Sequence, residues 1–180
     1  MIPYFIVFAI ATFLAFIAER CFKKEKKKSG IIILFCAILF LAIFAGLRTT
    51  DLGYDTSMYF TNIYREATNR SFAQYKMYMN SYRMENGFLL YAYILTAIGK
   101  NINFVLFGLQ FIVSFAYMLF AIHNKDKCSI TLSMFIYCCS LYAYSFNILR
   151  QGISLAFCFF MIIFYEKKKY KLMILSIILG

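Results

Sequence analysis

Long apolar runs alternate along this chain with short polar and basic segments. The hydrocarbon core of a bilayer is about 30 Å thick, so a helix that crosses it needs about 20 mostly apolar residues. The pattern predicts an all-α polytopic integral membrane protein with about six transmembrane helices. Six runs have or approach the required length: Ile2–Ala18, Ile31–Leu47, Phe104–Ile122, Ile130–Tyr144, Ile148–Tyr165 and the run that begins at Leu172.

Composition supports this class and excludes an ordinary soluble domain. Of the 180 residues, 63% are hydrophobic, and the mean hydropathy is +0.71. The chain has one proline and shows no internal repeat, so we expect residues 1–180 to form a single integral membrane domain. The last apolar run continues to Gly180 with no polar segment after it, and we interpret the chain as a fragment of a longer protein.

Basic residues gather in three short segments between the apolar runs. Twelve of the nineteen lysines and arginines lie at 20–28, 125–127 and 167–171. Short basic loops stay on the cytoplasmic side of a membrane, and they interact favourably with anionic lipid there. The net charge of +11 therefore indicates the lipid bilayer as a partner, and we expect no nucleic acid partner.

One apolar segment, Gly87–Gly99, is expected not to cross the bilayer. If every run crossed, the four lysines at 167–171 would lie outside. A stretch of 10–14 apolar residues is typical of a re-entrant or interfacial segment. If this segment dips in from the outer face, all three basic loops are cytoplasmic, and the loop 48–86 is extracytoplasmic. The N-terminus is then outside, and the first run is an anchor, because no basic residue precedes it.

The loop 48–86 carries an amphipathic pattern. Apolar and aromatic residues recur at helical spacing: Tyr59, Phe60, Ile63, Tyr64 and Ala67. Asp55 or Thr56 would be the N-cap, with Gly53 in the turn before it. We expect this helix to lie against the outer membrane surface, whereas the polar segment 71–84 predicts no particular structure.

Arg48 directly follows the second apolar run, and Asp55 lies seven residues later. Charges at membrane depth are unfavourable, so they are candidates for functional sites. Arg48 could hold a phosphate, and Asp55 could orient or deprotonate a hydroxyl. The alternative is structural: Arg48 extends to the lipid headgroups, and Asp55 caps a helix.

Arg150 lies between two apolar runs, directly after a predicted turn. With Asn147 as N-cap, Arg150 and Gln151 belong to the first turn of the next helix. The free amides and positive end of that helix, together with a guanidinium, form an anion site that suits a phosphate or pyrophosphate. Alternatively, Arg150 forms a structural ion pair with Glu85 or Asp55.

Glu85 precedes the short apolar segment, and the sequence leaves two roles open for it. It could act as a base or bind sugar hydroxyls, or it could cap the helix that follows. The six cysteines fall in apolar runs or cytoplasmic loops, without metal-ligand spacing, so no disulfide, metal site or cofactor is expected.

These residues together resemble the EpsG-like family of exopolysaccharide polymerases, which is related in kind to the Wzy polymerases. One element is the arginine, G-x-D and tyrosine at Arg48, Gly53, Asp55 and Tyr59. The second is the acidic-x-Gly-Phe element of residues 85–88, and the third is the Arg-Gln element of residues 149–154. Asn86 stands where the family usually has proline and Ser154 where it usually has alanine, and a later Phe-His element does not occur in the 180 residues.

The resemblance implies extracytoplasmic polymerisation of oligosaccharide repeat units carried on polyprenyl pyrophosphate. Arg150, Arg48 and Asp55 would be catalytic, with the arginines neutralising the leaving pyrophosphate. The substrate-binding residues would be Gly53, Tyr59, Glu85, Gln151 and Asn147. Other exopolysaccharide synthesis proteins are possible partners. The alternatives are a ligase, or a non-enzymatic transporter of lipid-linked oligosaccharide or scaffold of the synthesis complex.

Overall fold

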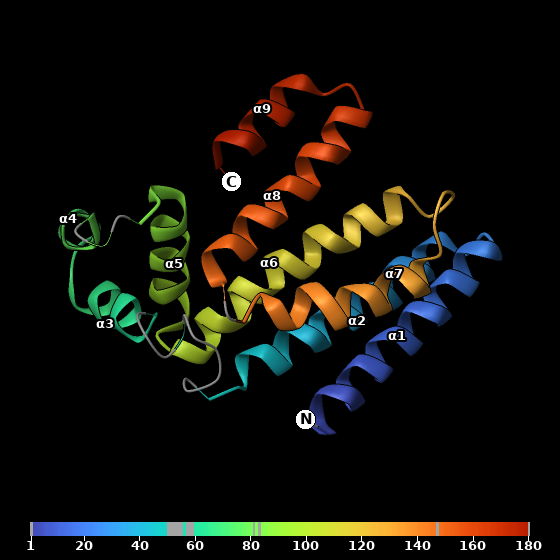
Figure 1. The fold of residues 1–180 in the computed structure, drawn as a ribbon, viewed down its shortest axis with the longest axis horizontal. Helices are drawn as coiled ribbons and strands as arrows, with labels where there is room; N and C mark the ends of the chain where they lie inside the picture. The colour runs from blue at the N-terminus through green and yellow to red at the C-terminus, as the bar shows by residue number, and fades with distance from the viewer. Residues whose placement is uncertain are drawn as a thin grey trace.

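The described part of the chain is built from helices. The computed structural model describes residues 2–49, 56, 60–80, 82, 84–146 and 148–179, and within these residues it contains no strand. Their order (Figure 1) is α1 (Ile2–Lys23), α2 (Lys27–Gly46), α3 (Thr61–Asn69), α4 (Phe72–Asn80), α5 (Asn86–Gly99), α6 (Ile102–His123), α7 (Ile130–Tyr137), the π-helix η2 (Cys138–Tyr142), α8 (Leu149–Glu166) and α9 (Tyr170–Leu179).

Four of these helices are long and apolar enough to cross a membrane. They are Pro3–Lys23 within α1, then α2, α6 and α8. The all-α membrane class is therefore confirmed. The other two predicted spans correspond to shorter apolar helices, Ile130–Tyr142 and Tyr170–Leu179.

Small residues let the first two helices approach each other closely. Ala11, Ala15 and Ala18 are fully buried along one side of α1, which packs on α2 and α7. Within a membrane such small residues increase van der Waals contact between backbones. A small residue also allows close packing at the end of α2. A Cβ on Gly46 would lie 2.9 Å from the backbone oxygen of Asn103 at the start of α6.

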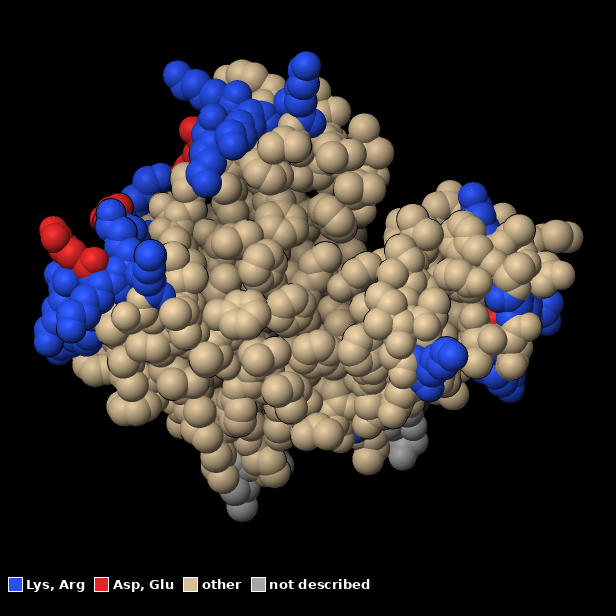
Figure 2. Space-filling model, turned by 180° about the vertical axis from the view of Figure 1, so that it is seen from behind, with Lys and Arg blue, Asp and Glu red and all other residues tan. Residues whose placement is uncertain are grey.

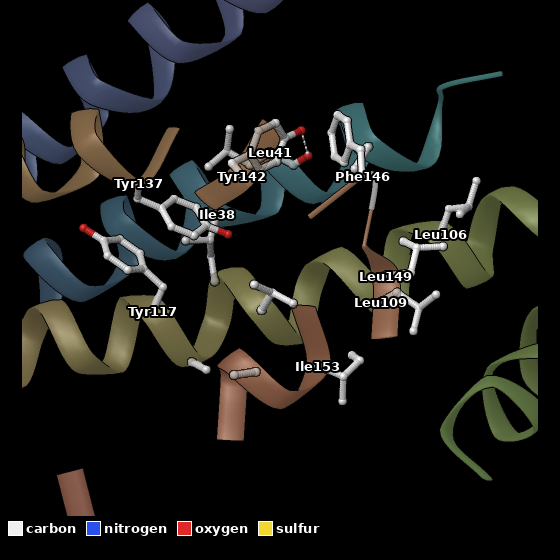
Figure 3. Packing of buried hydrophobic residues seen from close by; sticks show 14 of the residues in the cluster. Ile38, Leu41, Leu106, Leu109, Tyr117, Tyr137, Tyr142, Phe146, Leu149 and Ile153 are labelled. Atoms are coloured by element: carbon white, nitrogen blue, oxygen red, sulfur yellow. Dashed lines mark hydrogen bonds between the residues drawn. The ribbon is translucent and has the colours of Figure 1, made fainter. Parts of the chain in front are cut away.

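Stacked and edge-to-face aromatic rings fill the centre of the bundle. The rings of Tyr117 and Tyr137 are stacked with centroids 4.2 Å apart, and the ring of Tyr142 lies edge-on to Phe146 at 4.9 Å. The Tyr142 hydroxyl donates a hydrogen bond of 2.7 Å to the backbone carbonyl of Leu41 (Figure 3). The segment that follows α7 is thereby fixed against α2.

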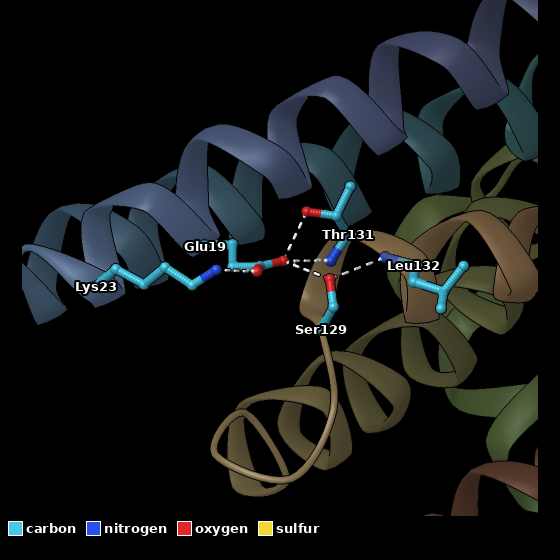
Figure 4. A network of polar contacts seen from close by, with 5 residues as sticks. All are labelled: Glu19, Lys23, Ser129, Thr131 and Leu132. Carbon is cyan, nitrogen blue, oxygen red and sulfur yellow. Dashed lines mark hydrogen bonds and ion pairs between the residues drawn. The ribbon is translucent and has the colours of Figure 1, made fainter.

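A carboxylate joins the end of α1 to the start of α7. Glu19 accepts hydrogen bonds from the Ser129 hydroxyl (2.7 Å), from the Thr131 backbone amide (2.9 Å) and from the Thr131 hydroxyl (2.7 Å), while Lys23 pairs with its other oxygen at 2.8 Å (Figure 4). Ser129 is itself the N-cap of α7 and accepts from Leu132. Glu19 therefore satisfies an amide of the first turn of α7 that has no partner within the helix.

A second carboxylate joins α8 to α6 at the same end of the molecule. Glu166 pairs with His123 at 2.6 Å and with Lys127 at 3.1 Å. The three basic loops consequently gather at one end, and Figure 2 shows their lysines and arginines together, apart from a second basic group over α3 and α4. This grouping agrees with the topology expected from loop charge, whereas the cytoplasmic location of this end stays a prediction.

Helix α5 runs alongside only the first part of α6. A left-handed residue, Lys100 with φ 47°, reverses the chain between the two helices. The Tyr91 hydroxyl donates a 2.9 Å hydrogen bond to the carbonyl of Gly108, and Leu95 packs on the same glycine. A helix of 14 residues is about 21 Å long. Helix α5 therefore packs on the first part of α6, and it is shorter than the roughly 30 Å of a hydrocarbon core.

Helix α3 is amphipathic, but its apolar face does not lie free for a membrane surface. Ile63 and Ala67 are buried, and α3 packs against α5. The α-helix begins at Thr61 with Phe60 at the N-cap position. Thr56 and Phe60 have π-helical geometry, and Asp55 lies outside the described residues. The apolar face of α3 is therefore covered by α5 in the described part, and the expected position of this helix at the outer membrane surface stays a prediction. Helix α4, where the sequence predicted no structure, buries Tyr75 and Met79.

Candidate functional site

A cavity of about 560 Å³ lies where three helix ends meet. The starts of α5 and α8 and the end of α9 form its walls. Figure 2 shows the surface hollowed between the part built by α8 and α9 and the part built by α3 to α5. Its volume is typical of a pocket for a small molecule or for the head of a larger one. Its lining residues are Glu85, Asn86, Gly87, Phe88, Ile148, Arg150, Gln151, Ile153, Ser154, Ile178 and Leu179.

Arg150 and Glu85 form a two-pronged ion pair inside this cavity. The Arg150 Nε donates to Glu85 Oε2 at 2.8 Å, and Arg150 Nη2 donates to Glu85 Oε1. The side chains are 31% and 61% exposed, respectively. A guanidinium binds a carboxylate and a phosphate through the same planar fork. The cavity therefore contains a preformed binding group for an oxyanion, occupied by a carboxylate of the protein.

Glu85 is the N-cap residue of α5, but its side chain does not act as the cap. Within the described residues the carboxylate makes no capping hydrogen bond to α5, although its backbone carbonyl accepts from Leu89. The hydrogen bond from Arg150 lowers the pKa of the Glu85 carboxyl, and partial burial opposes this shift. The prediction that the Glu85 side chain caps α5 is therefore wrong, because the carboxylate pairs with Arg150 instead. The carboxyl is ionised at neutral pH.

Two helix N-termini meet at the cavity and add to its positive potential. Helix α5 begins at Asn86 and α8 at Leu149, and both are longer than three turns. The first amides of a helix have no partner within it and favour anions. Ile148 is the N-cap residue of α8, and its side chain makes no capping hydrogen bond within the described chain. The prediction of Asn147 as N-cap is therefore wrong by one residue, and Asn147 lies outside the described residues.

The start of α8 lies opposite the middle of α6 rather than at its end. A Cβ on Gly152 would lie 3.7 Å from Val113 Cγ2, and Val113 is near the midpoint of α6 (Ile102–His123). Figure 3 likewise shows Leu149 beside Leu109. Because α6 is long enough to span the bilayer, Arg150 and Glu85 lie level with the interior of the predicted span. Ionisable groups at that depth are unfavourable and indicate a functional site.

Arg48 lies beside Phe146 in the α7–α8 connection and is not among the described residues that line this cavity. Its guanidinium lies 4.3 Å from the centroid of the Phe146 ring, and its Nη2 donates to the Thr56 hydroxyl at 3.0 Å. Arg48 is 7% exposed, and among the described residues its Nε and Nη1 have no acceptor. Burial lowers the pKa of Arg48 to about 10, so the group stays charged at neutral pH.

The predicted site residues are therefore brought together only in part. Arg150, Glu85 and Gln151 line one cavity, whereas Arg48 is not among the described residues that line it. Phe146 lies between Arg48 and the cavity in the sequence of contacts. The Arg48 guanidinium lies over its ring, and Ile148, which lines the cavity, follows it by two residues. Gly53, Asp55 and Tyr59 lie outside the described residues.

A buried polar network supports the α7–α8 connection, and the sequence analysis missed it. Gln110, in the middle of α6, accepts a hydrogen bond from the Ser145 hydroxyl at 2.8 Å and donates to the Tyr137 hydroxyl at 3.3 Å. Ser114 lies 2.8 Å from the same Tyr137 hydroxyl. The signal was present: Gln110 is an amide inside a long apolar run, where polar side chains mark interhelical contacts. The π-helix η2 lies in the same connection, and such π-helical turns are frequent at functional sites.

Fold and cavity together define an all-α integral membrane protein in which a guanidinium–carboxylate pair lines a cavity between helix ends. The model of the EpsG family matches residues 31–180, and the chain belongs to this family. The resemblance drawn from the sequence elements is thus confirmed. Comparison with curated proteins and with solved structures gives no match. Family membership suggests an exopolysaccharide-related polymerase function and a lipid-linked substrate in a membrane.

Proposed function

We propose that this protein polymerises oligosaccharide repeat units carried on polyprenyl pyrophosphate, outside the cytoplasmic membrane, in exopolysaccharide biosynthesis. The observation that carries the proposal is the Arg150 fork in a cavity at membrane depth. Membership of the EpsG family supports the reaction class. Polymerisation of this kind passes a growing glycan from its pyrophosphate carrier to a hydroxyl of the next lipid-linked unit.

In this proposal Arg150 binds the pyrophosphate and stabilises the charge that develops as it leaves. The amides at the starts of α5 and α8 support the same charge. Gln151 contacts the substrate from the next position of α8. Phe88, Ile153, Ile178 and Leu179 make part of the cavity wall apolar, which suits the first isoprene units of the carrier.

The remaining sequence-based roles are kept as proposals. Arg48 provides a second cation for the anionic substrate, Asp55 orients the acceptor hydroxyl, and Gly53, Tyr59 and Asn147 help to bind the substrate. The buried N–H groups of Arg48 that lack an acceptor in the described chain support an anion-binding role.

The experiment that tests the proposed function replaces Arg150 in the full-length protein, in cells that make the polymer. Arg150→Lys keeps a charge but loses the fork geometry. Loss of one oriented donor lowers a rate by about 10²–10³-fold in comparable sites, so polymer should fall to trace amounts while protein abundance is unchanged. Arg65→Lys is the matched control, because Arg65 is 63% exposed on α3, away from the cavity.

The same cells test the purely architectural reading of the ion pair. If Arg150 only pairs with Glu85, the double variant Arg150→Gln with Glu85→Gln removes both charges and should make polymer normally. We expect no polymer from it. Normal polymer length and amount in the double variant would remove Arg150 from the catalytic machinery.

A further inference from the structure

Glu85 occupies the hydrogen-bonding fork that a phosphate needs. The two nitrogens of Arg150 that face the cavity, Nε and Nη2, both donate to its carboxylate. A phosphate binds a guanidinium through the same pair of donors. Carboxylate and pyrophosphate therefore compete for Arg150, and the arrival of one displaces the other.

We propose that the lipid-linked pyrophosphate displaces Glu85 from Arg150, and that the released Glu85 carboxylate accepts the proton of the acceptor sugar hydroxyl. This inference rests on the proposed function. It adds the event that couples donor binding to activation of the acceptor, and it assigns the base for the transfer step.

The geometry allows this exchange without movement of a helix. Glu85 lies outside the helical turns of α5, and in the described chain no capping hydrogen bond holds its side chain there. Its side chain is 61% exposed, so a rotation about its own bonds releases it into the cavity that it already lines. Ion pairs with this much exposure are weak. A pyrophosphate, which carries more negative charge than a carboxylate, is therefore the stronger partner for Arg150.

The exchange also changes how well Glu85 serves as a base. While Arg150 holds it, the hydrogen bond lowers the pKa of the carboxyl, which makes it a poor proton acceptor. When the pyrophosphate takes the guanidinium, this effect is removed, and the added negative charge nearby raises the pKa. Among the described residues that line the cavity, Arg150 is the other titratable group. The carboxylate therefore becomes more basic when the donor is bound.

The transfer step needs no protein group other than Arg150 and Glu85 to account for its bonds, charge and proton. The acceptor oxygen forms a bond to the anomeric carbon of the donor glycan as the bond from that carbon to the pyrophosphate oxygen breaks. The electron pair of the broken bond stays on the pyrophosphate, where Arg150 stabilises it. The hydroxyl proton passes to Glu85 and then to water that enters the cavity, which opens to the surface. The products are the elongated glycan on its new carrier and free polyprenyl pyrophosphate.

The test uses the full-length protein in detergent with farnesyl pyrophosphate as the binding probe, and polymer formation in cells as the second readout. Glu85→Gln removes the competitor, so the probe should bind about fivefold more tightly, the scale of a partly exposed ion pair. Polymer should nevertheless fall by roughly 10²–10⁴-fold through loss of the base. Asp126→Asn is the matched control, since it removes a carboxylate from the basic end of the molecule, where Asp126 pairs with Lys125.

Each readout can overturn its part of the inference. Unchanged or weaker probe binding by Glu85→Gln contradicts the displacement, and wild-type polymer in that variant contradicts the proton transfer and favours Asp55 as the base. Glu85→Asp is a second variant with a carboxylate one methylene shorter. It should bind the probe more tightly than wild type and make more polymer than Glu85→Gln; equal polymer from the two at matched abundance contradicts the base role.

Failure of the proposed function gives a different result. In that case wild-type protein does not bind the probe, and Arg150→Lys still makes polymer. If the Arg150 variants lose both binding and polymer while Glu85→Gln changes neither, the polymerase proposal holds and the exchange does not.

Discussion

The guanidinium of Arg48 lies 4.3 Å from the centre of the Phe146 ring. This contact joins the residue that follows α2 to the connection between α7 and α8, nearly 100 residues further along the chain. Phe146 is 6% exposed, so the charge and the ring face each other away from water. A cation over an aromatic face contributes about 2 kcal/mol when it is desolvated, which offsets only part of the cost of burying the charge.

Replacing Arg48 separates its charge from its packing. Methionine has a similar length and no charge, and an apolar replacement of a poorly satisfied buried charge is often neutral or stabilising. We expect Arg48→Met to keep or raise the thermal midpoint of the purified protein, and to reduce polymer by about 10²-fold if the charge holds a phosphate. Arg65→Met, at an exposed position, is the control. Full polymer from Arg48→Met would leave Arg48 with a structural role alone.

Replacing Gln110 tests the polar network behind the cavity. Gln110→Ala removes the partner of Ser145 and one partner of Tyr137 and leaves a void in a buried position. We expect the free energy of unfolding to fall by about 2–4 kcal/mol. Asn80→Ala, at an exposed position that ends α4, should change it by no more than about 0.5 kcal/mol. Equal thermal midpoints for the two variants would show that the network contributes nothing.

The orientation in the membrane can be measured with an impermeant maleimide on intact cells. In a variant without native cysteines, Met77→Cys should be labelled from outside, because Met77 is 81% exposed on α4 in the loop expected to be extracytoplasmic. Lys26→Cys and Lys167→Cys should be labelled only after the cells are opened. Labelling of Lys167→Cys in intact cells would mean that α5 crosses the bilayer and that the basic end is divided between the two sides.

The ion pair of Glu85 should make stability depend on pH at the acidic end. Its folded-state pKa lies below the ordinary 4.5, so its contribution is present above that value and is lost as the pH falls through the folded-state pKa. The thermal midpoint of wild type should therefore exceed that of Glu85→Gln at neutral pH, and the two should converge under acidic conditions. The difference should be small, because the carboxylate is mostly exposed. A gap that widens on acidification would contradict the pairing.

Periodicity and length alone predicted the helices well and the site only in part. Apolar runs give helices because each must satisfy its own backbone in lipid, and so α1, α2, α6 and α8 lie within a few residues of their predicted bounds. The pairing of Arg150 with Glu85 was foreseen as an alternative, since a charge at depth requires a counter-ion. The meeting of Arg150 with Glu85 depends on how α5 packs relative to α6 and α8, which no local pattern encodes.

The errors have physical causes of the same kind. The packing of α3 on α5 was not foreseen, because a sequence shows that an apolar face must be buried but does not show which element covers it. Arg48 is not among the described residues that line the cavity, and its contact with the Phe146 ring joins residues far apart in sequence, which no local pattern encodes. Gln110 was overlooked because one amide barely changes the hydropathy of a long apolar run.

The carboxylate of Glu19 has a consequence for the order in which the protein is assembled. A membrane protein is inserted as it is synthesised, N-terminus first. The Ser129 and Thr131 groups that bind Glu19 follow it by 110 and 112 residues. Until they emerge, Lys23, one helical turn away, is the nearby counter-charge for this acid. The Glu19–Lys23 pair can therefore form within α1 alone, whereas the contact of Glu19 with α7 forms only after α7 has been synthesised.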